Sequence, residues 1–210
     1  LKLFEKVLLH RTEYITVVLE DIYQPQNASA VLRTCDCFGV QSVHIIENRN
    51  SFTVSNEVAL GSSKWLSLHN YSEKENNSLE AISSLKRKGY RIVATTPHKK
   101  EQLLDDFDLL KGKAALVFGS ELPGISDTLL QEADEFVKIP MYGFTESFHI
   151  SVSAAIVLHQ LTQKLREQPK SLWELDASAK NDVKLQWLRK TIKRSDLLEQ
   201  EFVAKQGKNL

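Results

Sequence analysis

The stretch AALVFGSELPGIS, residues 114–126, decides the fold of this chain. It opens with an apolar run, Ala114 to Phe118, that has the length of a buried strand. A loop follows in which one carboxylate, Glu121, stands between Gly119 and Gly124. Glycines in such a turn let backbone N–H and C=O groups approach whatever lies beside the strand end. The stretch predicts a buried strand that runs into a ligand-binding loop, with a plain turn as the alternative.

Strand-like and helix-like segments alternate on both sides of this stretch. Apolar or β-branched runs predict further strands at residues 15–19, 42–47, 65–69, 90–96 and 136–139. Apolar residues at three- and four-residue steps predict helices at residues 27–38, 79–88 and 147–165. This alternation predicts an α/β fold, an open and mostly parallel sheet with helices on both faces. Ligands of such sheets bind outside the carboxyl ends of the strands.

The composition is that of an ordinary water-soluble domain. The chain has 210 residues, of which 42% are hydrophobic, and Lys+Arg 27 against Asp+Glu 27 give a net charge of zero. Two cysteines, Cys35 and Cys37, are too few for a disulfide framework, which favours a reduced, cytoplasmic location. No apolar run reaches the roughly 20 residues of a membrane span, so no membrane partner is expected.

Helical segments are expected at both ends of the chain. Apolar residues at helical spacing begin near Phe4, and a separate amphipathic helix is predicted at about residues 182–194. The predicted division is an N-terminal helical extension at residues 1–14, an α/β domain at residues 15–167 and a C-terminal helical extension at residues 168–210.

Several common site motifs are absent from the sequence. The eight glycines never form Gly-x-Gly, so neither a dinucleotide fingerprint nor a Walker-type phosphate loop is present. No His-Glu-x-x-His motif occurs, and His44 is the only histidine near the cysteine pair, so no metal is expected. A Gly-x-Ser-x-Gly nucleophile elbow is missing as well. These absences argue against the usual NAD, ATP, zinc and serine-hydrolase chemistries.

The segment NASAVLR, residues 27–33, combines polar and apolar positions in a predicted helix. Asn27 stands where an N-cap belongs, and that role alone would explain it. Arg33 lies nearly two turns later beside apolar positions. A guanidinium buried there needs an anion, so Arg33 is the stronger candidate for a functional residue.

A third segment joins the last predicted strand to the longest apolar helix. The strand ends at Pro140 and Gly143, and the chain enters the helix through Ser147 and His149. His149 taken alone is more often a capping or core histidine than a catalytic one.

Two basic stretches stand out from the neutral total. One lies at residues 86–100 and the other at residues 184–194, and neither contains an acidic residue. Both are candidates for binding nucleic acid, with solvated helix faces as the alternative. The predicted RNA-binding residues are Arg11, Lys86, Arg87, Lys88, Lys184, Arg189, Lys190, Lys193 and Arg194.

Together the three polar segments resemble, in order and spacing, the three motifs of the SPOUT class of RNA methyltransferases, specifically its SpoU/TrmH family. Asn27 with Arg33 is similar to the first motif, residues 118–124 to the second, and residues 139–155 to the third. Gly61-Ser-Ser-Lys-Trp65 is also similar to a family segment, so the resemblance runs from about residue 15 to 165. It implies a C-terminal trefoil knot and a homodimer with the site at its interface.

The resemblance also implies which residues act. It assigns cofactor contacts with S-adenosyl-L-methionine to Thr95, Gly119, Ile139 and Phe148. It assigns catalytic roles to Arg33, Asn27, Glu121, Ser147 and His149. The family ordinarily has Asn where this chain has His149, and an imidazole, with one donor and one acceptor, titrates near neutrality.

The predicted activity is methyl transfer from S-adenosyl-L-methionine to a ribose 2'-hydroxyl of tRNA, with guanosine 18 of the D-loop as the target. Arg33 is expected to clamp the adjacent phosphate and to stabilise the developing alkoxide, because a guanidinium is almost never a free base. Two alternatives stay open, a 23S rRNA ribose methyltransferase and a non-catalytic RNA-binding module that kept the fold.

Overall fold

The computed structural model describes residues 1–96, 102–120 and 122–206. Its contacts divide the chain into two compact units. One consists of Arg11–Glu174, and the other of Leu1–His10 together with Leu175–Leu210.

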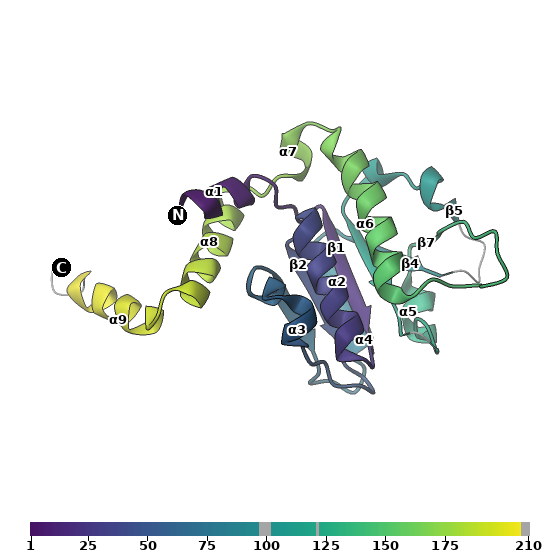
Figure 1. Cartoon of the computed structure of the whole chain (residues 1–210), viewed down its shortest axis with the longest axis horizontal. Helices are drawn as coiled ribbons and strands as arrows, with labels where there is room; N and C mark the ends of the chain where they lie inside the picture. The colour runs from purple at the N-terminus through teal and green to yellow at the C-terminus, as the bar shows by residue number, and fades with distance from the viewer. Residues whose placement is uncertain (97–101, 121, 207–210) are drawn as a thin grey trace. The chain divides into compact units, whose positions relative to one another are not determined.

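The described residues form one sheet of seven strands in the order β3-β2-β1-β6-β4-β7-β5. Figure 1 shows the neighbouring strands β1 and β2 side by side. Every pair of neighbours is parallel, so the expected α/β sheet is confirmed and contains no antiparallel pair among these strands. The strands are β1 Ile15–Glu20, β2 Ser42–Ile46, β3 Ser67–Tyr71, β4 Arg91–Thr95, β5 Gln102–Leu103, β6 Ala114–Phe118 and β7 Glu135–Lys138.

Helices connect the strands and cover both faces of the sheet. The α-helices are α1 Lys2–Leu8, α2 Pro25–Phe38, α3 Asn56–Ala59, α4 Asn77–Arg87, α5 Asp127–Glu132, α6 Ile150–Arg166, α7 Lys170–Trp173, α8 Ala177–Thr191 and α9 Ser195–Gln206. Short 3-10 helices lie at Ser62–Lys64, Leu104–Asp106 and Leu109–Lys111. Helices α2 and α6 pack on one face, and α4 and α5 pack on the other.

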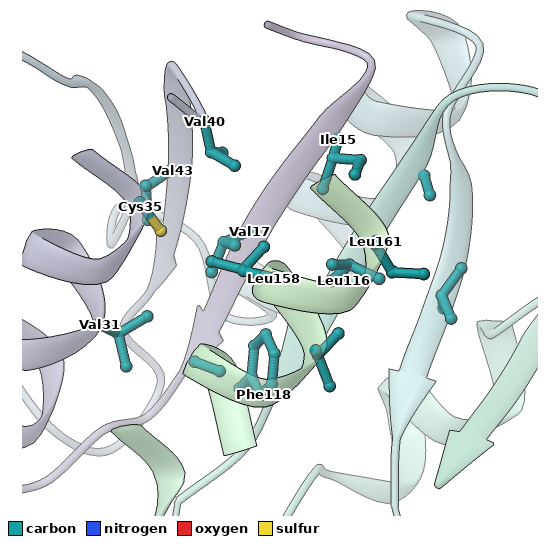
Figure 2. Packing of buried hydrophobic residues seen from close by; sticks show 14 of the residues in the cluster. Ile15, Val17, Val31, Cys35, Val40, Val43, Leu116, Phe118, Leu158 and Leu161 are labelled. Carbon is teal, nitrogen blue, oxygen red and sulfur yellow. The ribbon is translucent and has the colours of Figure 1, made fainter. Parts of the chain in front are cut away.

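The two central strands alternate their side chains between the two faces. Val17 of β1 and Leu116 of β6 belong to the cluster that α2 and α6 cover, whereas Val18 and Val117 belong to the cluster beneath α4 and α5. Figure 2 shows the first of these clusters, with Leu158 of α6 placed over β1. Because both faces are buried, the strands read as continuous apolar runs.

Thr12 joins the beginning and the end of the α/β unit. Its Oγ1 donates a hydrogen bond to the carbonyl oxygen of Trp173 at 2.6 Å, and its backbone pairs with Glu174 in an isolated antiparallel bridge. Thr12 also bridges to Val40, which follows Gly39, the C-cap of α2.

Two predicted helix starts are wrong. Helix α2 begins at Pro25 with Gln24 as its N-cap, so Asn27 lies inside the first turn and is not the cap. Proline suits that first position, because its fixed φ is helical and its missing N–H would have had no intrahelical partner. Helix α6 begins at Ile150 rather than Ser147, with His149 as its N-cap.

The second unit contains α1, α8 and α9. Asp176 caps α8 by accepting the backbone N–H of Ala179 at 2.8 Å. Trp187 of α8 is buried, and the ring of Phe4 of α1 meets it edge-on at 5.4 Å between centroids. The indole is therefore the centre of this small helical unit.

Candidate active site

A cavity of about 420 Å³ opens at the carboxyl ends of β4, β6 and β7. It gathers residues from four separate segments of the chain. All four residues to which the resemblance assigns cofactor contacts line it, as do two of the predicted catalytic residues. The six are Thr95, Gly119, Ile139, Ser147, Phe148 and His149.

Gly119 has no room for a side chain. A Cβ atom at this position would lie 2.2 Å from the carbonyl carbon of Gly124 and 2.3 Å from the nitrogen of Ile125. The loop after β6 folds back on itself here, because the N–H of Gly124 donates to the carbonyl oxygen of Ser120 at 3.0 Å. Gly124 has φ +69°, which favours glycine as well. The backbone of this tight loop forms one wall of the cavity.

Thr95 ends β4 beside the same cavity. Its Oγ1 donates to the carbonyl oxygen of Val117 at 2.7 Å, which ties β4 to the neighbouring β6. The hydroxyl hydrogen is used in this bond, so Thr95 presents to the cavity an oxygen that can accept a hydrogen bond.

The segment before α6 supplies the opposite wall. Ser147, Phe148 and His149 are exposed at the entrance, and Ile150 behind them is buried. The Nδ1 atom of His149 accepts the backbone N–H of Ser151 at 3.3 Å and lies 2.8 Å from its Oγ. Acceptance at Nδ1 places the proton of the neutral ring on Nε2. His149 therefore serves as the N-cap of α6 through its side chain.

The first segment does not reach this cavity within the chain. Neither Asn27 nor Arg33 lines it. Arg33 is exposed, which corrects the expectation of a buried guanidinium, and no other described residue forms a hydrogen bond or ion pair with it. Asn27 is buried, and its amide contacts the side-chain oxygen of Gln24 at 3.5 Å. Glu121, the remaining predicted catalytic residue, lies outside the described residues.

Glu20 is a buried carboxylate that sequence reasoning missed. It ends β1, and its side chain accepts two hydrogen bonds from Ser126 and one from the hydroxyl of Ser78. Ser126 is the N-cap of α5 and directly follows the loop that walls the cavity. The one available signal was a charged residue directly after the apolar run Val17-Val18-Leu19.

The predicted RNA-binding residues differ in their availability. Arg87 and Lys88 at the end of α4, and Lys193 and Arg194 after α8, are exposed. Three others form ion pairs with carboxylates of other helices. These pairs are Lys86 with Glu132 at 3.1 Å, Lys184 with Glu5 at 2.9 Å and Arg189 with Glu199 at 2.7 Å.

Arg11 has a different placement from the one predicted. Only 2% of its surface is exposed, and its guanidinium pairs with the carboxylate of Asp36 on α2. A guanidinium that is buried and paired in this way offers no surface to a phosphate. The prediction that Arg11 contacts RNA is therefore wrong for this structure.

In the described part of the chain, no group of three or more His, Cys, Asp or Glu side chains is placed to hold a metal ion. Nor does any helix within those ranges have the length and apolar character needed to cross a membrane.

Comparisons with known proteins match this chain to one family of RNA-modifying enzymes. The SpoU rRNA Methylase family matches residues 14–159. The chain is 44% identical over 195 residues, 93% of its length and 87% of the relative's, to the tRNA (guanosine(18)-2'-O)-methyltransferase of Borreliella burgdorferi. It is 35% identical to the Thermus thermophilus protein of the same name, over 89% of this chain and 94% of that one. The crystal structure of the A. aeolicus TrmH/SpoU tRNA modifying enzyme superposes with a TM-score of 0.79, at 26% identity, over 91% of this chain and 96% of that one.

Proposed function

We propose that this chain, which belongs to the SpoU rRNA Methylase family, transfers a methyl group from S-adenosyl-L-methionine to the ribose 2'-hydroxyl of guanosine 18 in tRNA. The observation that carries the proposal is the single cavity lined by Thr95, Gly119, Ile139 and Phe148. The activity named for the relatives of highest identity reported above supports the choice of tRNA over rRNA and over a non-catalytic role.

The cavity fits a cofactor with both apolar and polar parts. Its volume of about 420 Å³ lies in the usual range for small-molecule sites. Apolar side chains such as Ile139, Val157 and Leu130 line it, and the backbone at Gly119 is bare where a Cβ would close the loop. When bound, S-adenosyl-L-methionine supplies an electrophilic methyl group on a sulfonium. Thr95, Gly119, Ile139 and Phe148 would hold it in the cavity.

The other roles fall to groups at the rim of the cavity. Ser147 and His149, which line the cavity, would orient the ribose. Arg33 would clamp the adjacent phosphate and stabilise the alkoxide as the hydroxyl loses its proton to that phosphate or to water. Asn27 and Glu121 would support these groups. Correct placement of the hydroxyl supplies much of the rate of such a transfer.

A homodimer with the site at its interface accounts for the position of Arg33. Arg33 does not line the cavity of its own chain, so a second copy would complete the site. Large apolar side chains are exposed near the cavity, including Leu122 at 98% and Phe148 at 42%. Such groups are typical of surfaces that a partner covers. We also propose that the segment from β7 through α6 forms the trefoil knot.

The remaining parts of the chain are assigned to holding tRNA. Residues 1–14 and 168–210 would flank a methyltransferase domain at residues 15–167 and contribute Lys184, Arg189, Lys190, Lys193 and Arg194 to the RNA surface. Exposed ion pairs such as Lys184–Glu5 are weak and can exchange a carboxylate for a phosphate. Lys86, Arg87 and Lys88 would form a second patch. The free cysteines Cys35 and Cys37 fit a cytoplasmic enzyme.

The test is a methylation assay with labelled S-adenosyl-L-methionine on total tRNA and on rRNA, followed by mapping of the modified ribose. Label at the 2'-oxygen of guanosine 18 is the expected result. Label in rRNA alone would favour the ribosomal alternative. Cofactor binding without transfer to either RNA would favour the non-catalytic one.

A further inference from the structure

A second cavity, of about 320 Å³, lies on the other side of the loop after β6. It shares Ser120, Pro123, Gly124 and Ile125 with the cavity at the carboxyl ends of β4, β6 and β7, the cofactor cavity of the proposed function. The two cavities are therefore separated by one layer of backbone. The residues that line only the second cavity are Glu20, Asp21, Arg49, Asn50, Ser126, Asp127 and Thr128. A molecule bound at the mouth of the first cavity can therefore extend a part into the second.

The second cavity stands where the direction of the chain reverses in the sheet. From β1 the chain passes through α2 to β2 on one side, and from β6 it passes through α5 to β7 on the other. Helices α2 and α5 cover opposite faces, so the carboxyl ends of β1 and β6 diverge into a crevice. Ligands of open parallel sheets bind at such a switch point. The cofactor cavity lies beside β4, β6 and β7 and leaves this crevice free.

Hydrogen bonds fix the walls of this crevice in advance. The Oδ1 atom of Asp21 accepts backbone N–H groups of Asn48 at 2.7 Å, Arg49 at 2.8 Å and Asn50 at 3.4 Å. Asp21 itself has φ +52°, and its carbonyl oxygen accepts a bond from the amide of Asn50 at 2.9 Å. Glu20 holds Ser126 on the opposite side. Fixed walls reduce the ordering that a ligand must impose.

Two charged side chains of the crevice keep their hydrogen-bonding groups available. Arg49 and Asp127 are both exposed, and no described residue forms a hydrogen bond or ion pair with either side chain. One offers donors and the other offers two acceptor oxygens. A ligand that suits both must present adjacent donors on one edge and acceptors on another.

Guanine meets this requirement. Its Watson–Crick edge carries two neighbouring donors, N1–H and the N2 amino group, which match the two oxygens of a carboxylate. Its O6 and N7 atoms are acceptors that arginine contacts in pairs. Adenine places an acceptor, N1, beside its amino group and would set a lone pair against the carboxylate. Bases in single-stranded RNA loops are commonly read by such contacts.

We infer that the second cavity binds the guanine base of the target nucleotide, with Asp127 accepting from N1–H and the N2 amino group and Arg49 donating to O6 or N7. The ribose of the same nucleotide then lies at the mouth of the cofactor cavity, across the wall of Gly124 and Pro123. The inference rests on the proposed function, and it names the group that selects guanosine.

The test measures kcat/KM on tRNA transcripts that carry guanosine, inosine or adenosine at position 18. Inosine lacks only the N2 amino group, so it isolates the contact to Asp127. Asp127→Asn should lower kcat/KM for guanosine by about 10- to 100-fold, the range expected for a bidentate base contact. The same change should narrow the preference for guanosine over inosine. Arg49→Gln should lower the rate on guanosine and on inosine alike, because both bases keep O6.

The controls separate base reading from other effects. Asp106→Asn alters an exposed aspartate outside both cavities and should match the wild type. Affinity for S-adenosyl-L-methionine, measured by calorimetry, should be unchanged in all three variants. The inference would be overturned if Asp127→Asn kept the wild-type ratio of kcat/KM for guanosine to kcat/KM for inosine, whether both values were unchanged or both fell equally. A wild-type protein that methylates none of the transcripts would overturn the proposed function instead.

Discussion

Ser126 donates two hydrogen bonds to the carboxylate of Glu20, from its backbone N–H to Oε2 at 2.8 Å and from its hydroxyl to Oε1 at 2.7 Å. The two residues are 106 positions apart in the chain. Their contact joins the end of β1 to the start of α5 and so anchors the loop that separates the two cavities.

Removal of this anchor should destabilise the protein in a graded way. Glu20→Ala leaves buried donors of Ser126 and Ser78 without an acceptor, and each such group costs about 1–3 kcal/mol. Glu20→Gln keeps one oxygen that can accept the N–H of Ser126, so its loss should be smaller. Urea unfolding measures both, with exposed Glu75→Ala as the control. Equal stability of Glu20→Ala and Glu75→Ala would contradict the role of the anchor.

Gly119→Ala should weaken cofactor binding. The new methyl group would meet the backbone of Gly124 at 2.2 Å, so the loop must move away from its position along the cavity. We expect the Kd for S-adenosyl-L-methionine to rise about 10-fold or more, as overpacking usually costs 1–3 kcal/mol. Gly143→Ala is the matched control, because the nearest atom to its Cβ, the nitrogen of Thr145, is 4.0 Å away. The same Kd in both variants would refute the steric argument.

Arg33→Ala should abolish methyl transfer and leave cofactor affinity within a few-fold, since Arg33 does not line the cofactor cavity. Arg33→Lys should also fail, because an ammonium lacks the bidentate fork of a guanidinium. Inactive Arg33→Ala can then be mixed with Gly119→Ala at an S-adenosyl-L-methionine concentration far below the raised Kd of the Gly119→Ala cavity. If the site is completed by a second copy, exchange of subunits should restore about a quarter of the wild-type activity, because about a quarter of the sites then combine an intact cavity with an intact Arg33. No restoration in exchanged mixtures would place Arg33 and the cavity of the same chain in one site.

His149→Asn should preserve the start of α6, and His149→Ala should not. Asparagine is a strong N-cap, whereas replacement of a capping side chain by alanine costs about 1 kcal/mol. We expect the asparagine variant to keep the thermal midpoint and turnover, and the alanine variant to lose part of both. Thermal unfolding and initial rates check this pair. Comparable losses in both variants would show that His149 has a role that an amide cannot fill.

Acid should destabilise the protein through His44 and His69. Burial, and then the neighbouring His69 and Lys88, lower the pKa of His44 to about 3, and burial lowers the pKa of His69 as well. A neutral imidazole is favoured in the folded state, so this stability is present above the unfolded-state pKa of about 6.5 and is lost as pH falls. Each such histidine contributes up to about 1.4 kcal/mol per pH unit.

His44→Phe tests this dependence. It removes one titrating group and keeps a ring to stack on His69, whose centroid lies 4.6 Å from that of His44. The free energy of unfolding should then fall less steeply between pH 7 and pH 5, an interval of about two units chosen to bracket the unfolded-state pKa. His10→Gln, at an exposed histidine, is the control. An unchanged slope in His44→Phe would assign the acid sensitivity to other groups.

The sequence predicted the buried central strands well, because strands that are covered on both faces form continuous apolar runs. It missed the two-residue strand β5 and placed β3 two residues early, because neither is an apolar run. It also predicted Gly119 and Phe148, which line one cavity, from motif resemblance rather than from periodicity. The role of Glu20 depends on partners 58 and 106 residues away, and no local pattern carries that information. Arg11 was misread for the same reason, since its partner Asp36 comes from a distant helix.

The hydrogen bond and bridge that tie Thr12 to Trp173 and Glu174 mean that the α/β unit starts and finishes at one point. The segments that precede Arg11 and follow Glu174 therefore connect to the α/β unit at neighbouring points. Such an arrangement should let the outer helices be replaced by a different attachment, or the α/β unit be inserted into another protein, without rerouting the sheet.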